Sequence, residues 1–302
     1  MNRLQIITLL LFLTNSLLGQ QSNLDEKLIK QNKVKEVVST IHIYKTNLLP
    51  GMKEWEGKVQ LEKYDSNGNL IYLLIFDTLE KPGLELWYQY DTYGNKIEEK
   101  GINHPDGSSD SLKYLLTYKD GKLLTEERSD TLFTTEYFYN SKGQLIRKNQ
   151  QNKIRAAKYN TSPQEIPTTY LYDDRGNMTE LFRLDGDFKI REFFKYDERN
   201  RKVEHKWIYV ESETDTSGRI FLWEKYHYDK NGNLIQEENI GGYGGAPTVT
   251  YMYDRNGFLI KKDDGYSLIE YANDKYGNRI KETLKAGDKV VSETEYSYSF
   301  WK

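Results

Sequence analysis

Cysteine is absent from this chain of 302 residues. Its absence excludes disulfides, thiol nucleophiles, thiolate zinc sites and a lipid-modified N-terminal cysteine. The chain also has no large excess of positive or negative charge. Its 43 Lys and Arg residues nearly balance its 46 Asp and Glu residues, for a formal net charge of −3. This balance gives no electrostatic basis for binding nucleic acid. What the chain has in quantity is aromatic residues, with 25 Tyr and 11 Phe.

Motifs of known catalytic and metal sites are missing as well. The four His residues lie far apart in the sequence, with no HxH or HExxH spacing, and no GxSxG motif occurs. The glycine-rich segment Gly241–Gly245 lacks the Lys-Ser/Thr ending of a phosphate loop. The D-x-N-x-N segments at Asp65 and Asp229 resemble the start of a calcium loop, but Gly at position six and Glu at position twelve are absent. We therefore predict no catalytic residue, no metal ligand and no cofactor.

The N-terminal segment 1–19 has the pattern of a secretory signal peptide. Arg3 supplies a basic start, an apolar stretch runs from Leu4 to Leu13, and small or polar residues follow as far as Gly19. The apolar stretch is shorter than the roughly 20 residues that a membrane-spanning helix needs, which disfavours the alternative of an uncleaved anchor. We predict cleavage after Gly19 and a mature protein that is secreted or periplasmic, with no lipid anchor.

One phrase, Tyr-Asp-x-x-Gly-Asn-x-Ile, recurs along most of the chain. It is complete at Tyr64–Ile71, Tyr90–Ile97 and Tyr228–Ile235 and varies in the other copies, with Asn200 replacing Gly in one and Asn273 replacing Tyr in another. The nine copies begin at Tyr64, Tyr90, Tyr118, Tyr139, Tyr172, Tyr196, Tyr228, Tyr253 and Asn273.

Each copy has the chemistry of a hairpin turn. The Asp side chain can accept hydrogen bonds from backbone N–H groups two residues on, and Gly supplies the positive φ of a type I turn followed by a bulge. Apolar residues alternate with polar ones before the turn, and an aliphatic residue follows it in eight of the nine copies. A second turn signal lies between successive copies, so nine copies predict about eighteen strands.

The fold that we predict is all-β: one long antiparallel meander of stacked β-hairpins that forms a twisted, curved sheet. We divide the chain into a signal peptide over 1–19, an N-terminal segment over 20–59 and the repeat array over 60–302. The N-terminal segment is expected to hold a short helix over 24–31 and an opening strand over 33–44. A closing strand is expected over 293–301.

The repeated phrase resembles the YD repeat, also called the RHS repeat, over roughly residues 60–282. The family includes bacterial shells that encapsulate toxins, and also small exported members without a toxin tip, which this chain resembles most. The resemblance implies an extracellular all-β scaffold with a binding role. The shell-forming members have many more repeats and a variable toxin tip, and this chain ends soon after its last repeat.

These observations favour a secreted, non-enzymatic binding or structural module at the cell surface or in the periplasm, with a glycan or protein ligand. The first alternative is a partial shell element that joins other chains through an exposed edge strand near Tyr296–Trp301 and carries an effector. The second is a glycoside hydrolase with two carboxylates in an aromatic groove. The candidate ligand-binding aromatics are Trp87 and Trp223, which packing in the core would also explain, and Tyr243 in the glycine-rich loop.

Overall fold

The computed structural model describes residues 26–44, 54–129, 133–152, 165–185, 188–212, 214–242 and 248–302. In these ranges one short helix, α2 (Glu26–Gln31), precedes twenty strands. The first ten strands are β1 (Val34–Ile43), β2 (Trp55–Tyr64), β3 (Leu70–Phe76), β4 (Pro82–Tyr90), β5 (Lys96–Asn103), β6 (Ser108–Lys119), β7 (Lys122–Arg128), β8 (Phe133–Tyr139), β9 (Leu145–Asn152) and β10 (Glu165–Tyr172). The last ten are β11 (Met178–Asp185), β12 (Phe188–Tyr196), β13 (Lys202–Val210), β14 (Arg219–Tyr228), β15 (Leu234–Gly242), β16 (Val249–Tyr253), β17 (Leu259–Asp263), β18 (Leu268–Asn273), β19 (Arg279–Ala286) and β20 (Lys289–Phe300).

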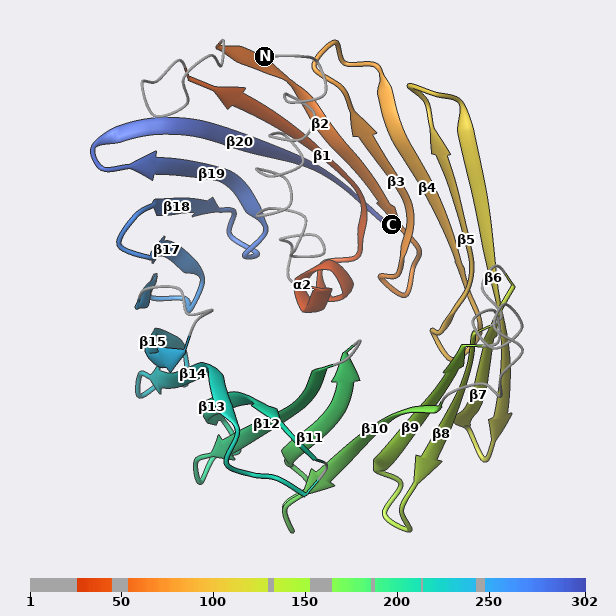
Figure 1. The fold of residues 1–302 in the computed structure, drawn as a ribbon. Coiled ribbons are helices and arrows are strands. Elements are labelled where there is room, and N and C mark those ends of the chain that lie inside the picture. The colour runs from red at the N-terminus through yellow and green to blue at the C-terminus, as the bar shows by residue number, and fades with distance from the viewer. Residues whose placement is uncertain are drawn as a thin grey trace.

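The strands form one closed antiparallel barrel (Figure 1). Each strand pairs with its neighbours in sequence, and β1 pairs with β20 as well as with β2. The predicted all-β meander and the eighteen strands expected from nine copies are confirmed, and the curved sheet closes into a barrel, which was not predicted. The nine repeats supply β2 to β19, and the opening and closing strands add two more. Because these two strands pair with each other, the sheet has no free edge there.

The hairpin turns have the geometry that the repeated phrase predicts. In the turn after β14, the Oδ1 atom of Asp229 accepts hydrogen bonds from the backbone N–H groups of Asn231 at 2.8 Å and Asn233 at 2.9 Å. Its Oδ2 atom accepts a further bond from the Asn233 side chain. Gly232 has a φ of 94°, in the region that favours glycine. At the corresponding place in another turn Asn200 adopts a φ of 60°, which explains why Asn can replace Gly.

The tyrosine of the phrase joins each repeat to the one before it. The Tyr228 hydroxyl, for example, donates a hydrogen bond of 2.7 Å to the backbone carbonyl of Lys202, the first residue of β13. The same bond recurs from Tyr90 to Leu70, Tyr139 to Leu123, Tyr172 to Leu145, Tyr196 to Met178 and Tyr253 to Leu234, at 2.7–3.0 Å. Tyr118 instead donates to the Asp91 carboxylate of the copy before it. Tyr298 of β20, outside the nine copies, makes the same bond to the Arg279 carbonyl at 2.6 Å. Asn273 preserves it with its side-chain amide, which donates to the carbonyl of Leu259 at 2.9 Å.

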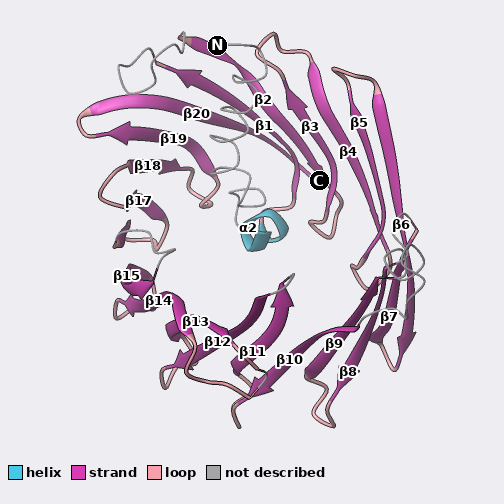
Figure 2. Ribbon diagram, in the orientation of Figure 1, coloured by secondary structure: helices cyan, strands magenta, loops and turns pink. Residues whose placement is uncertain are grey.

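Helix α2 packs where the barrel closes, within the outline of the ring in the view of Figure 2. Its buried residue Ile29 lies in a core cluster with Val34 and Val37 of β1 and Tyr64 of β2. Leu70, Tyr296 and Tyr298 pack against this cluster. A short helix of six residues is unstable alone, so this packing must hold it in place. The short helix and the two terminal strands therefore form as predicted, and their ends lie within four residues of the expected ones. Residues 24 and 25, the expected start of the helix, are outside the described ranges.

A second buried cluster lies away from the closure. It comprises Phe182 of β11 and Ile208 and Val210 of β13, with Leu184, Phe193 and Ile220 packed against it. The two clusters share no residue and lie on different parts of the ring. A chain built from short-range repeats thus has several local cores in place of one central core.

Candidate functional site

The predicted ligand-binding tryptophans lie in strands and contact their cross-strand neighbours. Trp87 of β4 is half-buried, and its ring packs edge-on against Tyr72 with a centroid distance of 5.7 Å. Trp223 of β14 is half-buried, with the Nζ atom of Lys206 5.5 Å from the centre of its ring. Tyr243 and the loop that holds it are outside the described residues. The structure therefore places Trp87 and Trp223 far apart in the ring, on strands that do not pair.

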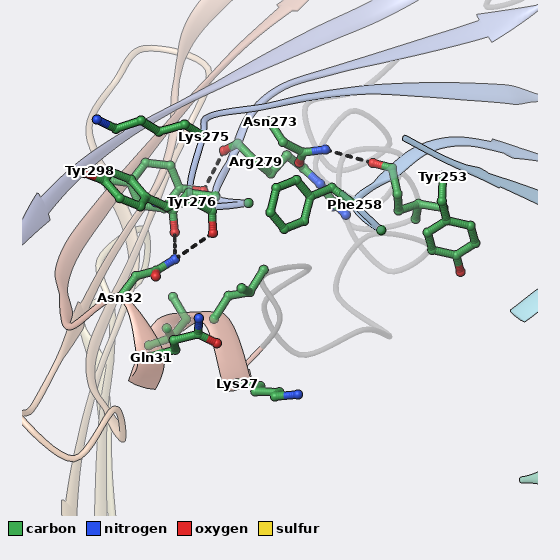
Figure 3. Close-up of a pocket in the computed structure, with 16 residues that line it drawn as sticks. Lys27, Gln31, Asn32, Tyr253, Phe258, Asn273, Lys275, Tyr276, Arg279 and Tyr298 are labelled. Carbon is green, nitrogen blue, oxygen red and sulfur yellow. Dashed lines mark hydrogen bonds between the residues drawn. The ribbon is translucent and has the colours of Figure 1, made fainter. Parts of the chain in front are cut away.

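A cavity of about 630 Å³ lies between α2 and the rim of the barrel (Figure 3). One wall is α2 with the residue that follows it, Asn32. The opposite wall consists of two successive hairpin regions, 253–259 and 273–279. Tyr298 of β20 completes the lining. Neither Trp87 nor Trp223 is among the lining residues, and sequence reasoning did not predict this cavity.

Two hydrogen bonds fix α2 at one side of the cavity. The side-chain amide of Asn32 donates to the Oδ1 atom of Asn278 at 2.7 Å and to the backbone carbonyl of Tyr276 at 3.3 Å. Asn278 is itself 4% exposed and donates to the Oδ2 atom of Asp274 in its own turn. The helix and the turn are therefore connected through a buried amide, and both walls are positioned by the hairpin chemistry of the repeat.

The lining combines aromatic rings, amides and cations. Figure 3 shows the Phe258 ring between Tyr276 and Tyr253, on the side that faces α2. The cations are Lys27, Lys275 and Arg279, and none of the sixteen lining residues is Asp or Glu. Rings flanked by amides and charges can stack on a flat apolar face while polar groups bind its substituents.

Arg279 and Lys275 contact groups next to the cavity. The Arg279 guanidinium lies 4.1 Å from the centre of the Tyr271 ring and 3.3 Å from the Oε2 atom of Glu282. The Lys275 ammonium lies 4.8 Å from the centre of the Tyr276 ring. Burial raises the pKa of Glu282, although the nearby Arg279 charge opposes this effect. Burial also raises the pKa values of Tyr253 and Tyr298, so both hydroxyls remain neutral hydrogen-bonding groups at physiological pH.

The histidines form pairs with glutamates, not a shared site. His42 contacts Glu54 at 3.0 Å and His104 contacts Glu85 at 2.8 Å. His205 contacts Glu192 at 2.9 Å, and His227 contacts Glu238 at 3.1 Å. In the described part of the chain, no group of three or more His, Asp or Glu residues could hold a metal ion.

Two features of the described residues bear on the alternative functions. The segment expected to be an exposed edge, Tyr296–Trp301, belongs largely to β20, which pairs with β1 throughout. The Trp301 backbone N–H also donates to the carbonyl of Lys33. The cavity beside α2 has no Asp or Glu among its lining residues.

Helices long and apolar enough to cross a bilayer are not found among the described residues. The chain matches no protein-family model and no curated protein. Similar solved structures include the TcdB2-TccC3 complex with Cdc42, at 16% identity and a TM-score of 0.44, over 85% of this chain and 14% of that chain. A porin-like protein from Bacteroides uniformis is similar at 9% identity and a TM-score of 0.35, over 88% of this chain and 98% of that chain. This chain thus spans about one seventh of the TcdB2-TccC3 chain.

Proposed function

We propose that this chain is an exported, non-enzymatic YD-repeat protein that binds a glycan at the cell surface or in the periplasm. The observation that carries the proposal is the cavity beside α2, where the rings of Tyr253, Phe258 and Tyr276 lie among amide side chains. Aromatic faces stack on the apolar faces of sugar rings, and amides hydrogen-bond their hydroxyl groups. A closed barrel provides a rigid scaffold for such a site.

The test is affinity electrophoresis of residues 20–302 against a panel of soluble neutral and acidic polysaccharides. We expect at least one polymer to retard the protein and Tyr276→Ala to remove the retardation. Tyr93→Ala is the matched control, because Tyr93 has the same position in its own turn and is 61% exposed, compared with 57% for Tyr276, but does not line the cavity.

The outcomes are separable. Retardation that persists in Tyr276→Ala but disappears in Trp87→Ala or Trp223→Ala would move the site to the strand tryptophans. Retardation by no polymer would reject a glycan ligand and favour a protein ligand.

A further inference from the structure

The first copy of the repeat departs from the pattern two residues before its tyrosine. Glu62 occupies this position, whereas the corresponding residue of the other eight copies is Tyr, Phe or Leu. The alternation of side chains along a strand places Glu62 on the same face of β2 as Tyr64, and Glu62 is only 4% exposed. A buried carboxyl group where every other copy has a large apolar or aromatic side chain indicates a role that packing alone does not require.

Two hydrogen bonds hold the Glu62 carboxyl group, and its described neighbours supply no positive charge. Its oxygens accept bonds from the Gln60 amide at 2.6 Å and from the Tyr64 hydroxyl at 2.7 Å. Its cross-strand neighbours are apolar, Val37 of β1 and Leu73 of β3. Burial raises the pKa of Glu62, and the two hydrogen bonds oppose the rise. Among the described residues, no charged side chain contributes to this shift.

The charged and titratable side chains around Glu62 face elsewhere or remain neutral. Lys63 is on the opposite face of β2, with its Nζ atom 3.8 Å from Glu36 of β1. On β20, the Tyr298 hydroxyl is neutral at physiological pH, because burial raises its pKa. The charged residues of α2 are all exposed: Glu26, Lys27 and Lys30. In the part of the chain that the structure describes, an ionised Glu62 therefore lacks the counter-charge that stabilises a buried ion.

Helix α2 packs on the layer that contains this carboxyl group. Its Ile29 side chain lies in one cluster with Val37, which is opposite Glu62, and with Tyr64, which donates to Glu62. If Glu62 ionises, water must enter this layer, because a buried carboxylate without a counter-charge is strongly unfavourable. The strands around Glu62 are paired on both sides, whereas α2 has six residues and little stability of its own. The helix is therefore the element that moves most easily.

We propose that α2 is a pH-sensitive latch, which covers Glu62 while the carboxyl group is protonated and is released when it ionises. The folded pKa of Glu62 is above the unfolded value, so the stabilisation is fully present below the unfolded pKa and is lost as the pH rises through the folded pKa. The latch is thus closed in acid and opens as the pH rises. Release uncovers Val34, Val37 and Tyr64, which are at most 4% exposed in the closed state. This inference is independent of the proposed ligand.

Hydrogen exchange at several pH values tests the latch, with each rate divided by the intrinsic rate at that pH to give a protection factor. We expect the protection of residues 26–31 to fall at least about tenfold as the pH rises, the effect of one pKa unit, while β11 to β14 remain protected. Glu62→Gln, whose side chain stays neutral, should keep α2 protected at every pH.

Glu224→Gln is the matched control. Glu224 accepts the same kind of bond from Tyr226 at 2.7 Å, but it lies on β14, which does not contribute to the cluster around Ile29. The protection of α2 in this variant should fall with pH as it does in the wild type. Constant protection in the wild type, a fall that persists in Glu62→Gln, or an equal loss of protection in β11 to β14 would each overturn the latch.

The midpoint of the release provides a second test. Tyr64→Phe and Gln60→Ala each remove a hydrogen bond that lowers the pKa of Glu62, so each should shift the midpoint to higher pH. Gln60 is outside the cluster around Ile29, so Gln60→Ala keeps the test available if circular dichroism shows that Tyr64→Phe is unfolded. If these side chains act only in packing, protection will fall equally at every pH with no shift of the midpoint, and that result would overturn the assignment.

Discussion

At the scale of single residues, the tyrosine of the repeat acts mainly through its hydroxyl. Half-buried strands also favour Phe, so packing alone would not require Tyr at this position. The bond from Tyr228 to the Lys202 carbonyl shows what the hydroxyl adds: it satisfies a backbone acceptor at the start of the preceding hairpin's second strand. Asn273 supports this interpretation, because it lacks the ring and preserves the bond.

Replacing Tyr228 with Phe should therefore destabilise the fold by about 1 kcal/mol, the typical net value of one hydrogen bond. Denaturant unfolding monitored by circular dichroism measures the change. Tyr266→Phe is the control, because Tyr266 is 78% exposed, and it should unfold at the same denaturant concentration as the wild type. A loss in Tyr266→Phe as large as that in Tyr228→Phe would contradict this role of the repeat tyrosine.

Glu62 is a buried carboxylate with two donors. The Tyr64 hydroxyl donates to its Oε2 atom at 2.7 Å, and the Gln60 amide donates to its Oε1 atom at 2.6 Å. Burial raises the pKa of Glu62, and these two hydrogen bonds oppose the rise. Because the folded pKa is above the unfolded value, the contribution of Glu62 to stability is fully present below the unfolded pKa and is lost as the pH rises through the folded pKa.

Glu62→Gln should remove that pH dependence. As the pH rises above about 4, the unfolded pKa of Glu, the unfolding free energy of the wild type should fall relative to that of Glu62→Gln. Tyr64→Phe should make the fall larger, since it removes a bond that lowers the pKa of the carboxylate. Urea titrations at several pH values provide the measurement, and parallel curves for wild type and Glu62→Gln would contradict the assignment.

Ionisation of the tyrosines should limit stability at high pH. Burial, together with nearby carboxylates, raises the pKa values of Tyr72 and Tyr88 to about 12, and burial with a nearby Glu282 does the same for Tyr271. Folded pKa values above the unfolded value of about 10 mean that this stability is intact below pH 10 and is lost as the pH approaches 12. Ultraviolet titration of tyrosinate should show these residues ionising together with unfolding. Early, non-cooperative ionisation of all tyrosines would contradict this prediction.

At the scale of elements, α2 depends on one buried side chain. Ile29 is 3% exposed and packs against Val34, Val37 and Tyr64. Ile29→Ala should release the helix, since an Ile-to-Ala change in a core costs about 2–5 kcal/mol and a helix of six residues has little stability of its own. Hydrogen exchange should rise in 26–31 but not in β11 to β14. Glu26→Ala, at an exposed position of the same helix, is the control and should leave exchange in 26–31 low.

The hairpins could be predicted from the sequence because their chemistry is local. An Asp, two polar residues and a Gly determine each turn within five residues, and the alternation of the flanks sets the faces of the strands. The site could not be predicted in this way, because Ile29, Phe258 and Asn273 come together only after the barrel closes. A signal was nevertheless present: Asn273 and Phe258 depart from the repeated phrase in two adjacent copies, and departures from a repeat are candidates for function.

At the scale of the whole molecule, closure depends on β1 and β20. Thr294 of β20 lies opposite Ile41 of β1 on one side and opposite Glu282 of β19 on the other. Because both neighbouring strands are paired with β20, the Thr294 backbone N–H points toward a paired strand whichever side it faces. No local pattern in the sequence predicted that β1 and β20 would pair, because the pairing joins opposite ends of the chain. The predicted twisted, curved sheet did not include this closure for that reason.

Thr294→Pro should open the barrel, because Pro removes a backbone donor and its ring does not fit a central strand. We expect a larger hydrodynamic radius or self-association through the exposed edges in size-exclusion chromatography. Ser66→Pro is the control, since Ser66 has the turn position that favours Pro, and it should elute like the wild type. A compact monomer from Thr294→Pro would show that the barrel does not need this pairing.

The pairing of β1 with β20 also determines the order in which the parts of the barrel can form. Among the strands β1 is made first and β20 last, whereas each hairpin can form as soon as its own residues are available. Contacts between distant residues form slowly, because a long loop must close first. Until β20 is in place, β1 and the free end of the sheet present unpaired edges, so the chain is most prone to aggregation before these two strands pair. The final strand is thus both the last part of the barrel to be made and the part that ends this vulnerable period.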